Sequence, residues 1–258
     1  NLSYNQDFNV YKYRNYYNGG GVAMGDINND GLIDVYLTAN QKKNKLYLNK
    51  GDFKFEDISE FSNSSGQKAW STGVTMVDIN NDGFLDIYVC NSGDIKGDNK
   101  QNELFINNGD LTFTESAKVY GLDNIGYSTQ ATFLDYDHDG DLDMFLLNAP
   151  SNNLSQKIKY VEDGFPDYTT DKFFINEDSK FIESSKNVGL NAVSYGLGVV
   201  ASDLNHDGIP LKILGHLYTY HTYLEAHPGP RFRPLCRRAA SHLRARRRGV
   251  RGGGGRGE

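Results

Sequence analysis

A nine-residue pattern of acidic and amide side chains occurs three times in this chain and begins a fourth time. The copies begin at Asp26, Asp78, Asp135 and Asp203. Each complete copy has side-chain oxygens at positions 1, 3, 5 and 9 and a glycine at position 6. Ca²⁺ takes six to eight oxygen ligands, including a backbone carbonyl at position 7 of such loops, and glycine permits the positive φ of a sharp reversal. The predicted ligands are Asp26, Asn28, Asp30, Leu32, Asp34, Asp78, Asn80, Asp82, Phe84, Asp86, Asp135, Asp137, Asp139, Asp141 and Asp143.

The third and fourth copies depart from the first two. The third has Asp137 at position 3, where the first two copies have asparagine, and the extra charge predicts the tightest calcium site. The fourth copy supplies Asp203, Asn205 and Asp207, but Leu211 follows Pro210 at the ninth position. The sequence therefore predicts about three calcium ions and a doubtful fourth.

Two alternatives to calcium remain open from the residues alone. Asn-Asp-Gly is also a tight-turn sequence, although a turn does not require the acids at positions 1 and 9. Magnesium demands octahedral geometry and keeps its waters, so it fits the pattern less well. We expect a structural role for the ions, because no loop offers an open coordination position beside a general base.

A longer repeat surrounds the loops. An alternating segment precedes each loop and an apolar run follows the first three, and the loops recur after 52, 57 and 68 residues. Four β-rich runs per unit indicate a four-stranded antiparallel sheet, and a period of that length is typical of a propeller blade. The sequence thus predicts an all-β fold, a partial β-propeller of about three and a half four-stranded antiparallel blades with calcium loops.

Composition divides the chain near residue 210. Residues 1–209 hold 31 acidic and 16 basic residues, whereas residues 210–258 hold 11 basic and 2 acidic residues. We predict a lead-in segment at 1–17, repeats at 18–209 and an anomalous Arg/Gly-rich tail at 210–258. The predicted blades span 18–64, 65–122, 123–190 and, incompletely, 191–209. A frameshift or vector-derived sequence accounts for a tail that interrupts a metal loop, and we expect the tail to be disordered or poorly packed.

The loops and their flanking strands resemble the FG-GAP/VCBS repeats of integrin α-type β-propellers. The segments 16–26 and 45–51 are similar to the first blade of secreted bacterial repeat proteins related to cartilage acidic protein, which often carry an ASPIC/UnbV segment. This resemblance covers residues 8–209 and implies a secreted or cell-surface propeller with calcium in its blade loops. It implies no catalytic residues, and no ASPIC/UnbV segment is present in this sequence.

We therefore expect a calcium-stabilised binding or adhesion scaffold for a protein or carbohydrate ligand, and not an enzyme. The acidic repeats disfavour nucleic acid as a partner of residues 1–209, and no stretch approaches 18 apolar residues, so we expect no membrane span. The chain begins at Asn1 without a signal peptide, so we expect a processed form or a fragment. An insertion in the third unit offers Tyr160, Phe165 and Tyr168 as ligand contacts, or is a variable surface loop.

Two other functions remain as alternatives. The first is a polysaccharide-active enzyme on the same scaffold, and the second is nucleic-acid binding through the basic tail. Zinc binding by His216, His221, His227 and Cys236 is disfavoured, because their spacing matches no strong zinc pattern. We expect His138 and His206, at loop position 4, to face solvent, and Cys90 to be a buried small hydrophobe.

Overall fold

A computed structural model describes the repeat region of the chain. The described residues are 4, 6, 9, 16, 20–68, 70–93, 100–149, 169–188, 190 and 196–202, with the backbone of 211–216, 223–225 and 233–234. The elements are β1 (Val22–Gly25), β2 (Asp34–Leu37), β3 (Lys45–Asn49), β4 (Phe55–Asp57), β5 (Ser71–Val77), β6 (Asp86–Asn91), β7 (Glu103–Asn107), β8 (Phe113–Glu115), α1 (Ala117–Tyr120), β9 (Ser128–Leu134), β10 (Asp143–Asn148), β11 (Lys172–Glu177), β12 (Lys180–Glu183), β13 (Gly196–Ser202), β14 (Leu211–His216), β15 (Tyr223–Glu225) and β16 (Arg233–Pro234).

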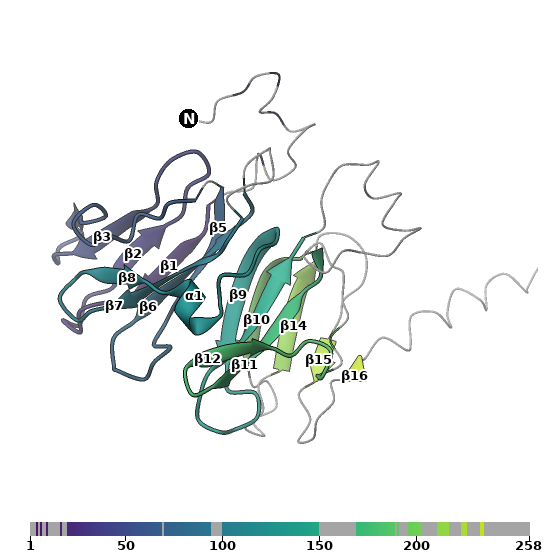
Figure 1. Cartoon of the computed structure of the whole chain (residues 1–258). Helices are drawn as coiled ribbons and strands as arrows, with labels where there is room; N and C mark the ends of the chain where they lie inside the picture. Colours follow the sequence, from purple (N-terminus) through teal and green to yellow (C-terminus); the bar gives the residue numbers. More distant parts are fainter. Residues whose placement is uncertain are drawn as a thin grey trace, which may run out of the picture.

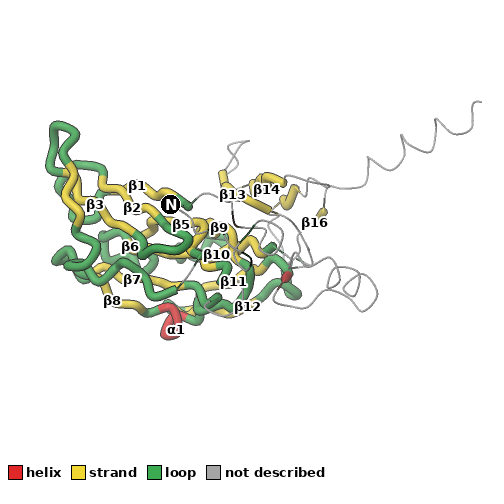
Figure 2. The backbone as a smooth tube through the Cα atoms, turned by 90° about the horizontal axis from the view of Figure 1, so that it is seen from above, coloured by secondary structure: helices red, strands yellow, loops and turns green. Residues whose placement is uncertain are grey.

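The strands form four sheets of four strands each, and every sheet is built from strands consecutive in the chain. We call them sheet 1 (β1–β4), sheet 2 (β5–β8), sheet 3 (β9–β12) and sheet 4 (β13–β16). All strand pairs are antiparallel. The first strands β1, β5, β9 and β13 lie next to one another in that order, so the sheets follow each other side by side (Figures 1 and 2). The predicted all-β fold of four-stranded antiparallel units is confirmed.

Sheet 4 differs from the expected half blade. Its first strand β13 precedes the predicted boundary, but β14, β15 and β16 lie beyond residue 210, within the segment expected to be a tail. Ser202 pairs with Leu211, so the chain returns along β13 directly after the fourth loop. The backbone thus has a fourth complete set of strands. The origin of residues 210–258 and the domain boundaries drawn from the sequence remain predictions.

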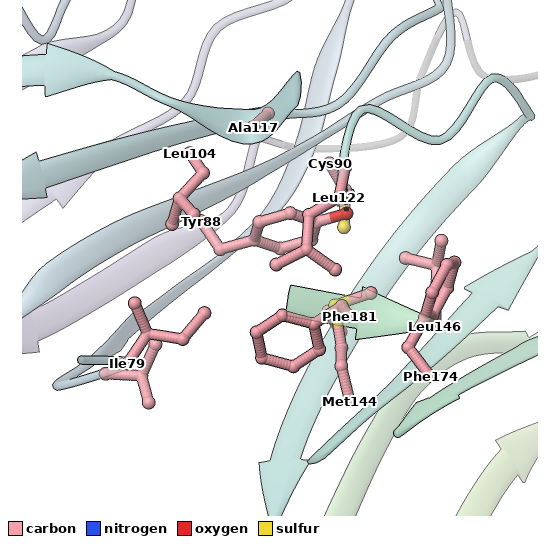
Figure 3. Packing of buried hydrophobic residues seen from close by; sticks show 12 residues of the cluster. Ile79, Tyr88, Cys90, Leu104, Ala117, Leu122, Met144, Leu146, Phe174 and Phe181 are labelled. Atoms are coloured by element: carbon pink, nitrogen blue, oxygen red, sulfur yellow. Dashed lines mark hydrogen bonds between the residues drawn. The ribbon is translucent and has the colours of Figure 1, made fainter. Parts of the chain in front are cut away.

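Apolar side chains between successive sheets form three hydrophobic clusters. One lies between sheets 1 and 2, the second between sheets 2 and 3, and the third between sheets 3 and 4. Figure 3 shows the second cluster, in which Tyr88 and Leu104 of sheet 2 face Met144 and Phe174 of sheet 3. Cys90 is fully buried in this cluster and makes no disulfide, as the sequence predicts. Successive residues of a strand point to opposite faces of the sheet. A sheet that lies between two others therefore packs one set of side chains against the preceding sheet and the other set against the following sheet.

Close contact between neighbouring first strands depends on glycine and threonine. A Cβ built on Gly21 would lie 2.5 Å from the Thr72 carbonyl oxygen, and one on Gly73 would overlap the Thr129 carbonyl oxygen. The Thr72 hydroxyl donates a hydrogen bond of 2.7 Å to the Ser128 carbonyl, and the Thr129 hydroxyl donates one of 2.8 Å to the Gly196 carbonyl. Glycine in a strand marks such close backbone approach. The alternating segments before the loops therefore hold successive sheets together.

The helical content of the described residues is small. The helix α1 has four residues and is followed by Gly121, whose φ of 76° is left-handed. Among the described residues no helix has the length and apolar character needed to cross a membrane.

Candidate metal loops

The first three nine-residue patterns form the connections from the first to the second strand of sheets 1, 2 and 3. The position-6 glycines Gly31, Gly83 and Gly140 have φ of 84°, 88° and 97°, as the need for a sharp reversal predicts. Position 4 is also left-handed in all three loops, at Asn29, Asn81 and His138. Asparagine and histidine are enriched in this conformation. Position 4 therefore projects outward, and the His138 side chain is exposed.

The acids at positions 1 and 5 accept hydrogen bonds from the loop backbone. In the first loop the Asp26 carboxylate accepts bonds from the amides of Asp30 and Gly31, at 3.1 and 2.7 Å. The Asp30 carboxylate accepts a 2.8 Å bond from the Leu32 amide. The second loop repeats this arrangement with Asp78 and Asp82. These bonds turn the carboxylates of positions 1 and 5 toward the backbone of their own loop in the first two loops, and in the third loop Asp135 accepts a bond from the His138 amide instead.

Position 3 separates the first two loops from the third. The Asn28 and Asn80 side-chain amides donate hydrogen bonds of 3.0 and 2.9 Å to the position-5 carboxylates Asp30 and Asp82. The Asn28 Oδ1 atom is buried and has no hydrogen-bond partner among the described residues. A buried oxygen without a donor is costly unless something positively polarised meets it. The first loop therefore holds one oxygen suited to a cation.

The third loop has no amide group at position 3. Oxygens of Asp135, Asp137 and Asp139 all lie within 4.8 Å of one another, and among the described residues this is the one group of three or more histidine, cysteine, aspartate or glutamate side chains found so close together. Burial and the neighbouring acids Asp139 and Asp135 raise the pKa of Asp137. Like charges this close repel unless a cation lies between them. The donor set, all oxygen and anionic, matches the ligands that Ca²⁺ prefers.

The position-9 acids have a structural role that the sequence pattern does not reveal. Asp34 accepts hydrogen bonds from the amides of Ile27 and Asn49, at 3.0 and 2.8 Å, and is fully buried. Asp86 and Asp143 make the equivalent pairs of bonds in sheets 2 and 3. Each acid thus fixes the start of its loop to the end of the third strand. A carboxylate has about four lone-pair sites, so a metal ligand role for position 9 is compatible with these bonds and remains a prediction.

Burial also dominates the electrostatics of the position-9 acids. It raises the pKa of Asp86 and of Asp143 to about 6, although the backbone hydrogen bonds favour the charged form. Desolvation is again the main cause of the raised pKa of Asp34. The charged groups that contribute to these raised pKa values are the other acids of the same loop, and no lysine or arginine is among the causes.

An asparagine at the end of the third strand, or one residue before it, contacts each of the first three loops, and sequence reasoning did not assign it a role. The side-chain amides of Asn49, Asn107 and Asn176 donate to the carbonyls of Ile33, Leu85 and Leu142, at 2.9, 3.1 and 3.4 Å. The available signal is its recurrence, because each repeat carries an apolar strand that ends in asparagine.

Asn107 also joins the first two loops across the boundary between sheets. Its side-chain amide donates a second hydrogen bond, of 2.8 Å, to the carbonyl of Ile27 in the first loop. The Asn29 side chain in turn donates to the Gly83 carbonyl in the second loop at 3.0 Å. Two hydrogen bonds thus connect neighbouring loops that are more than 50 residues apart in the sequence.

Several predicted sites lie outside the described residues. These include the fourth loop with Asp203, Asn205, Asp207 and His206, and the insertion aromatics Tyr160, Phe165 and Tyr168. The side chains of the disfavoured zinc group, His216, His221, His227 and Cys236, are not described either.

Consecutive four-stranded antiparallel sheets with an acidic loop between the first two strands define a β-propeller type of repeat protein. A family model described as FG-GAP-like repeat matches residues 26–89 and 92–146, and the matched segments contain the three complete loops. The chain is also similar to cartilage acidic protein 1 of Xenopus tropicalis, with 28% identity over 211 residues. That alignment covers 78% of this chain and 29% of the relative, so the chain spans less than a third of the relative's length. The chain therefore carries FG-GAP-like repeats over the matched residues.

Proposed function

We propose that the protein is a calcium-stabilised scaffold that works outside the cell and binds a protein or carbohydrate ligand. The proposal that the protein binds calcium rests on the third loop, where carboxylate oxygens of Asp135, Asp137 and Asp139 lie close together and position 3 offers no side-chain amide. The location is supported by the FG-GAP-like repeats and by similarity to a protein named for cartilage, a tissue that consists largely of extracellular matrix.

The chain's own residues prepare the sites. Backbone amides orient the acids at positions 1 and 5, and the position-9 acid holds the loop against the third strand. Bound calcium would supply the positive charge that offsets the mutual repulsion of these carboxylates. Extracellular modules bind calcium with dissociation constants of about 10⁻⁴–10⁻³ M. A site at the tighter end therefore stabilises the fold by about 1.4 kcal/mol at millimolar calcium.

Calorimetric titration of the full chain with calcium tests this proposal. The expected stoichiometry is about three ions per chain, with a concurrent rise in melting temperature. The same titration with magnesium should give weaker binding, because the loops offer many protein oxygens and magnesium keeps its waters. Absence of calcium binding by a chain whose circular dichroism shows folded β-structure would refute the calcium part.

The ligand-binding part needs a separate measurement. Glycan and extracellular-matrix protein arrays, probed with the full chain in calcium, are expected to give binding without chemical turnover. Turnover of a polysaccharide in calcium would instead support the enzyme alternative. Binding of single-stranded RNA that disappears when residues 235–258 are deleted would support the nucleic-acid alternative.

A further inference from the structure

The connection between sheets 1 and 2 contains the sequence Asn63-Ser-Ser65, which matches the Asn-x-Ser acceptor pattern for N-linked glycans. Two more such sequences begin at Asn1 and Asn153, and both of these asparagines lie outside the described residues. A glycan is bulky and solubilising, so its asparagine has to lie on the surface of the folded protein. The surroundings of Asn63 therefore decide whether the fold can carry a glycan at this position.

Exposed and buried side chains alternate along this turn. Ser62 and Ser64 are fully buried, and their hydroxyls share a hydrogen bond of 2.7 Å. The Ser65 side chain is also buried, whereas Phe61 and Asn63 are exposed. The serines thus hold the turn from the inside, and a group attached to Asn63 extends into solvent without displacing them.

Backbone hydrogen bonds attach the turn to both neighbouring sheets. The Phe113 amide of sheet 2 donates a bond of 2.8 Å to the Ser62 carbonyl. The Asn44 amide, directly before β3 of sheet 1, donates a bond of 2.9 Å to the Ser65 carbonyl. Asn63 lies between these two attached residues, so the packing of the two sheets fixes it at the surface.

Sheet 2 is followed by a corresponding turn that has glycine in place of Asn63. The amides of Ser62 and Tyr120 each donate a hydrogen bond to the carbonyl four residues earlier, at 2.8 and 3.1 Å. The next residue is Asn63 in one turn and Gly121 in the other, and both are left-handed, with φ of 57° and 76°. Because glycine adopts this conformation without strain, Asn63→Gly removes the carboxamide and preserves the turn.

An aromatic side chain lies beside the acceptor. Phe61 precedes Asn63 by two residues, and its side chain is 64% exposed. Two residues span at most about 7 Å between Cα atoms, so a sugar attached to Asn63 lies within reach of the Phe61 ring. A pyranose ring has an apolar face of C–H groups, and covering an exposed aromatic ring with apolar surface is favourable.

We propose that Asn63 is an N-glycosylation site and that the first N-acetylglucosamine of its glycan packs against Phe61. The inference rests on the extracellular location proposed above, because this modification belongs to secreted proteins. The co-substrate is an oligosaccharide linked to a lipid pyrophosphate. A bond forms between the Asn63 Nδ2 atom and C1 of the first sugar, and the C1–O bond breaks. The lipid pyrophosphate leaves with the electron pair, and the amide nitrogen loses one proton to solvent.

Site-resolved mass spectrometry tests the acceptor. The full chain, preceded by a secretion signal, is produced in cultured animal cells, and both secreted and retained protein are collected. Peptide N-glycosidase in heavy-oxygen water then converts each glycosylated asparagine into a labelled aspartate. We expect the label at Asn63 in the unmodified chain and its loss in Ser65→Ala, which keeps Asn63 but removes the acceptor pattern. An unmodified chain without label at Asn63 would overturn the proposal, as would equal label in Ser65→Ala, which indicates spontaneous deamidation.

A melting experiment tests the contact with Phe61. Asn1→Gln and Asn153→Gln are introduced into every sample, and an endoglycosidase trims the glycan to one sugar. The same chains made in bacteria provide the sugar-free references. We expect the sugar to raise the melting temperature by about 1–5 °C, and Phe61→Ala to remove at least half of that rise.

Val119→Ala is the matched control, because Val119 is exposed and precedes Gly121 as Phe61 precedes Asn63. It should leave the effect of the sugar unchanged. An equal rise with and without the Phe61 ring would overturn the proposed contact.

A calcium titration of the same secreted protein separates this inference from the proposed function. Asn63 lies outside the nine-residue loops, so about three ions are expected with or without the glycan. A chain that binds calcium but has no glycan at Asn63 would overturn this inference alone. A glycosylated chain that is folded and binds no calcium would overturn only the calcium part of the proposed function.

Discussion

Replacing Asn107 by alanine is the most direct test of how the metal loops are joined. The Asn107 side chain accepts a 2.9 Å hydrogen bond from the Gly109 amide and donates to the carbonyls of Leu85 and Ile27. Asn49 is its counterpart in sheet 1, and its side chain makes the two equivalent local bonds, with Gly51 and Ile33. The pair therefore differs by the hydrogen bond that crosses between sheets and by burial, because Asn107 is buried and Asn49 is half-buried.

The structure sets the expected magnitudes. Each lost hydrogen bond costs about 0.5–1.5 kcal/mol net, and an acceptor left buried without a donor costs about 1–3 kcal/mol. Asn49→Ala removes two bonds in a more exposed setting, so we expect a loss of about 1–2 kcal/mol in the free energy of unfolding. Asn107→Ala also leaves the buried Ile27 carbonyl without the donor that Asn107 supplies, so we expect a loss of about 2–5 kcal/mol in the free energy of unfolding.

Urea unfolding followed by the fluorescence of Trp70, the single tryptophan of the chain, measures both losses. Trp70 is buried beside Tyr16, with ring centroids 6.0 Å apart, so unfolding changes its environment. The experiment is done in chelator, so that differences in metal binding do not contribute. If both variants lost the same unfolding free energy, with an unchanged slope of that free energy against urea concentration, the conclusion that Asn107 makes a stabilising hydrogen bond between sheets would be refuted.

Four further predictions concern single residues. Asp139→Ala removes the hydrogen bond from the Asp141 amide and one predicted metal ligand, so it is expected to lower the melting temperature more in calcium than in chelator, by calorimetry; equal loss in both would mean that this acid serves the turn alone. Gly140→Ala should cost about 1–2 kcal/mol in calcium and in chelator alike, by urea unfolding, because φ is 97° while a Cβ there would touch nothing; an unchanged stability would show that the turn adapts. Leu104→Ala, in the cluster between sheets 2 and 3, should cost about 2–5 kcal/mol in the same assay, and a loss below 1 kcal/mol would contradict this packing. Burial raises the pKa of Glu103, so the folded state holds the Glu103 proton more tightly than the unfolded state does. The contribution of Glu103 to stability therefore falls as pH rises from the ordinary pKa of 4.5 through the raised value. Glu103→Gln should remove that part of the pH dependence of the urea midpoint, and parallel curves of midpoint against pH for the two proteins would refute this.

Local chemistry explains how much of this fold was accessible from the sequence. The loop hydrogen bonds join residues two to five positions apart, as in Asp26 with Asp30 and Gly31, so the loops are encoded within nine residues. Alternation of apolar residues on either side of each loop specifies strands, and its recurrence specifies repeated sheets. The all-β class therefore followed from the residues themselves, and the resemblance to FG-GAP repeats rested on the recurring loop motif.

The role of the position-9 acids and of Asn107 was not accessible in this way. Asp34 reaches the Asn49 amide 15 residues later, and Asn107 reaches the Ile27 carbonyl 80 residues earlier. Such bonds exist only after the sheets have packed, so nothing within one repeat indicates them. The first strand of the fourth sheet was predicted but its last three strands were not, because residues beyond 210 lack the repeat pattern from which the other strands were inferred.

Two nearly identical segments show where sequence stops and tertiary structure decides. Val22-Ala-Met24 and Val74-Thr-Met76 precede equivalent loops and both form first strands of sheets. The sequence determined their extended conformation, because alternating apolar residues and the following acidic turn are local properties. Only the tertiary structure decided that Val74 is buried and Val22 is exposed. The physical reason is that burial requires a second surface. Sheet 1 packs against the face of sheet 2 that carries Val74, whereas no described sheet packs against the face of sheet 1 that carries Val22.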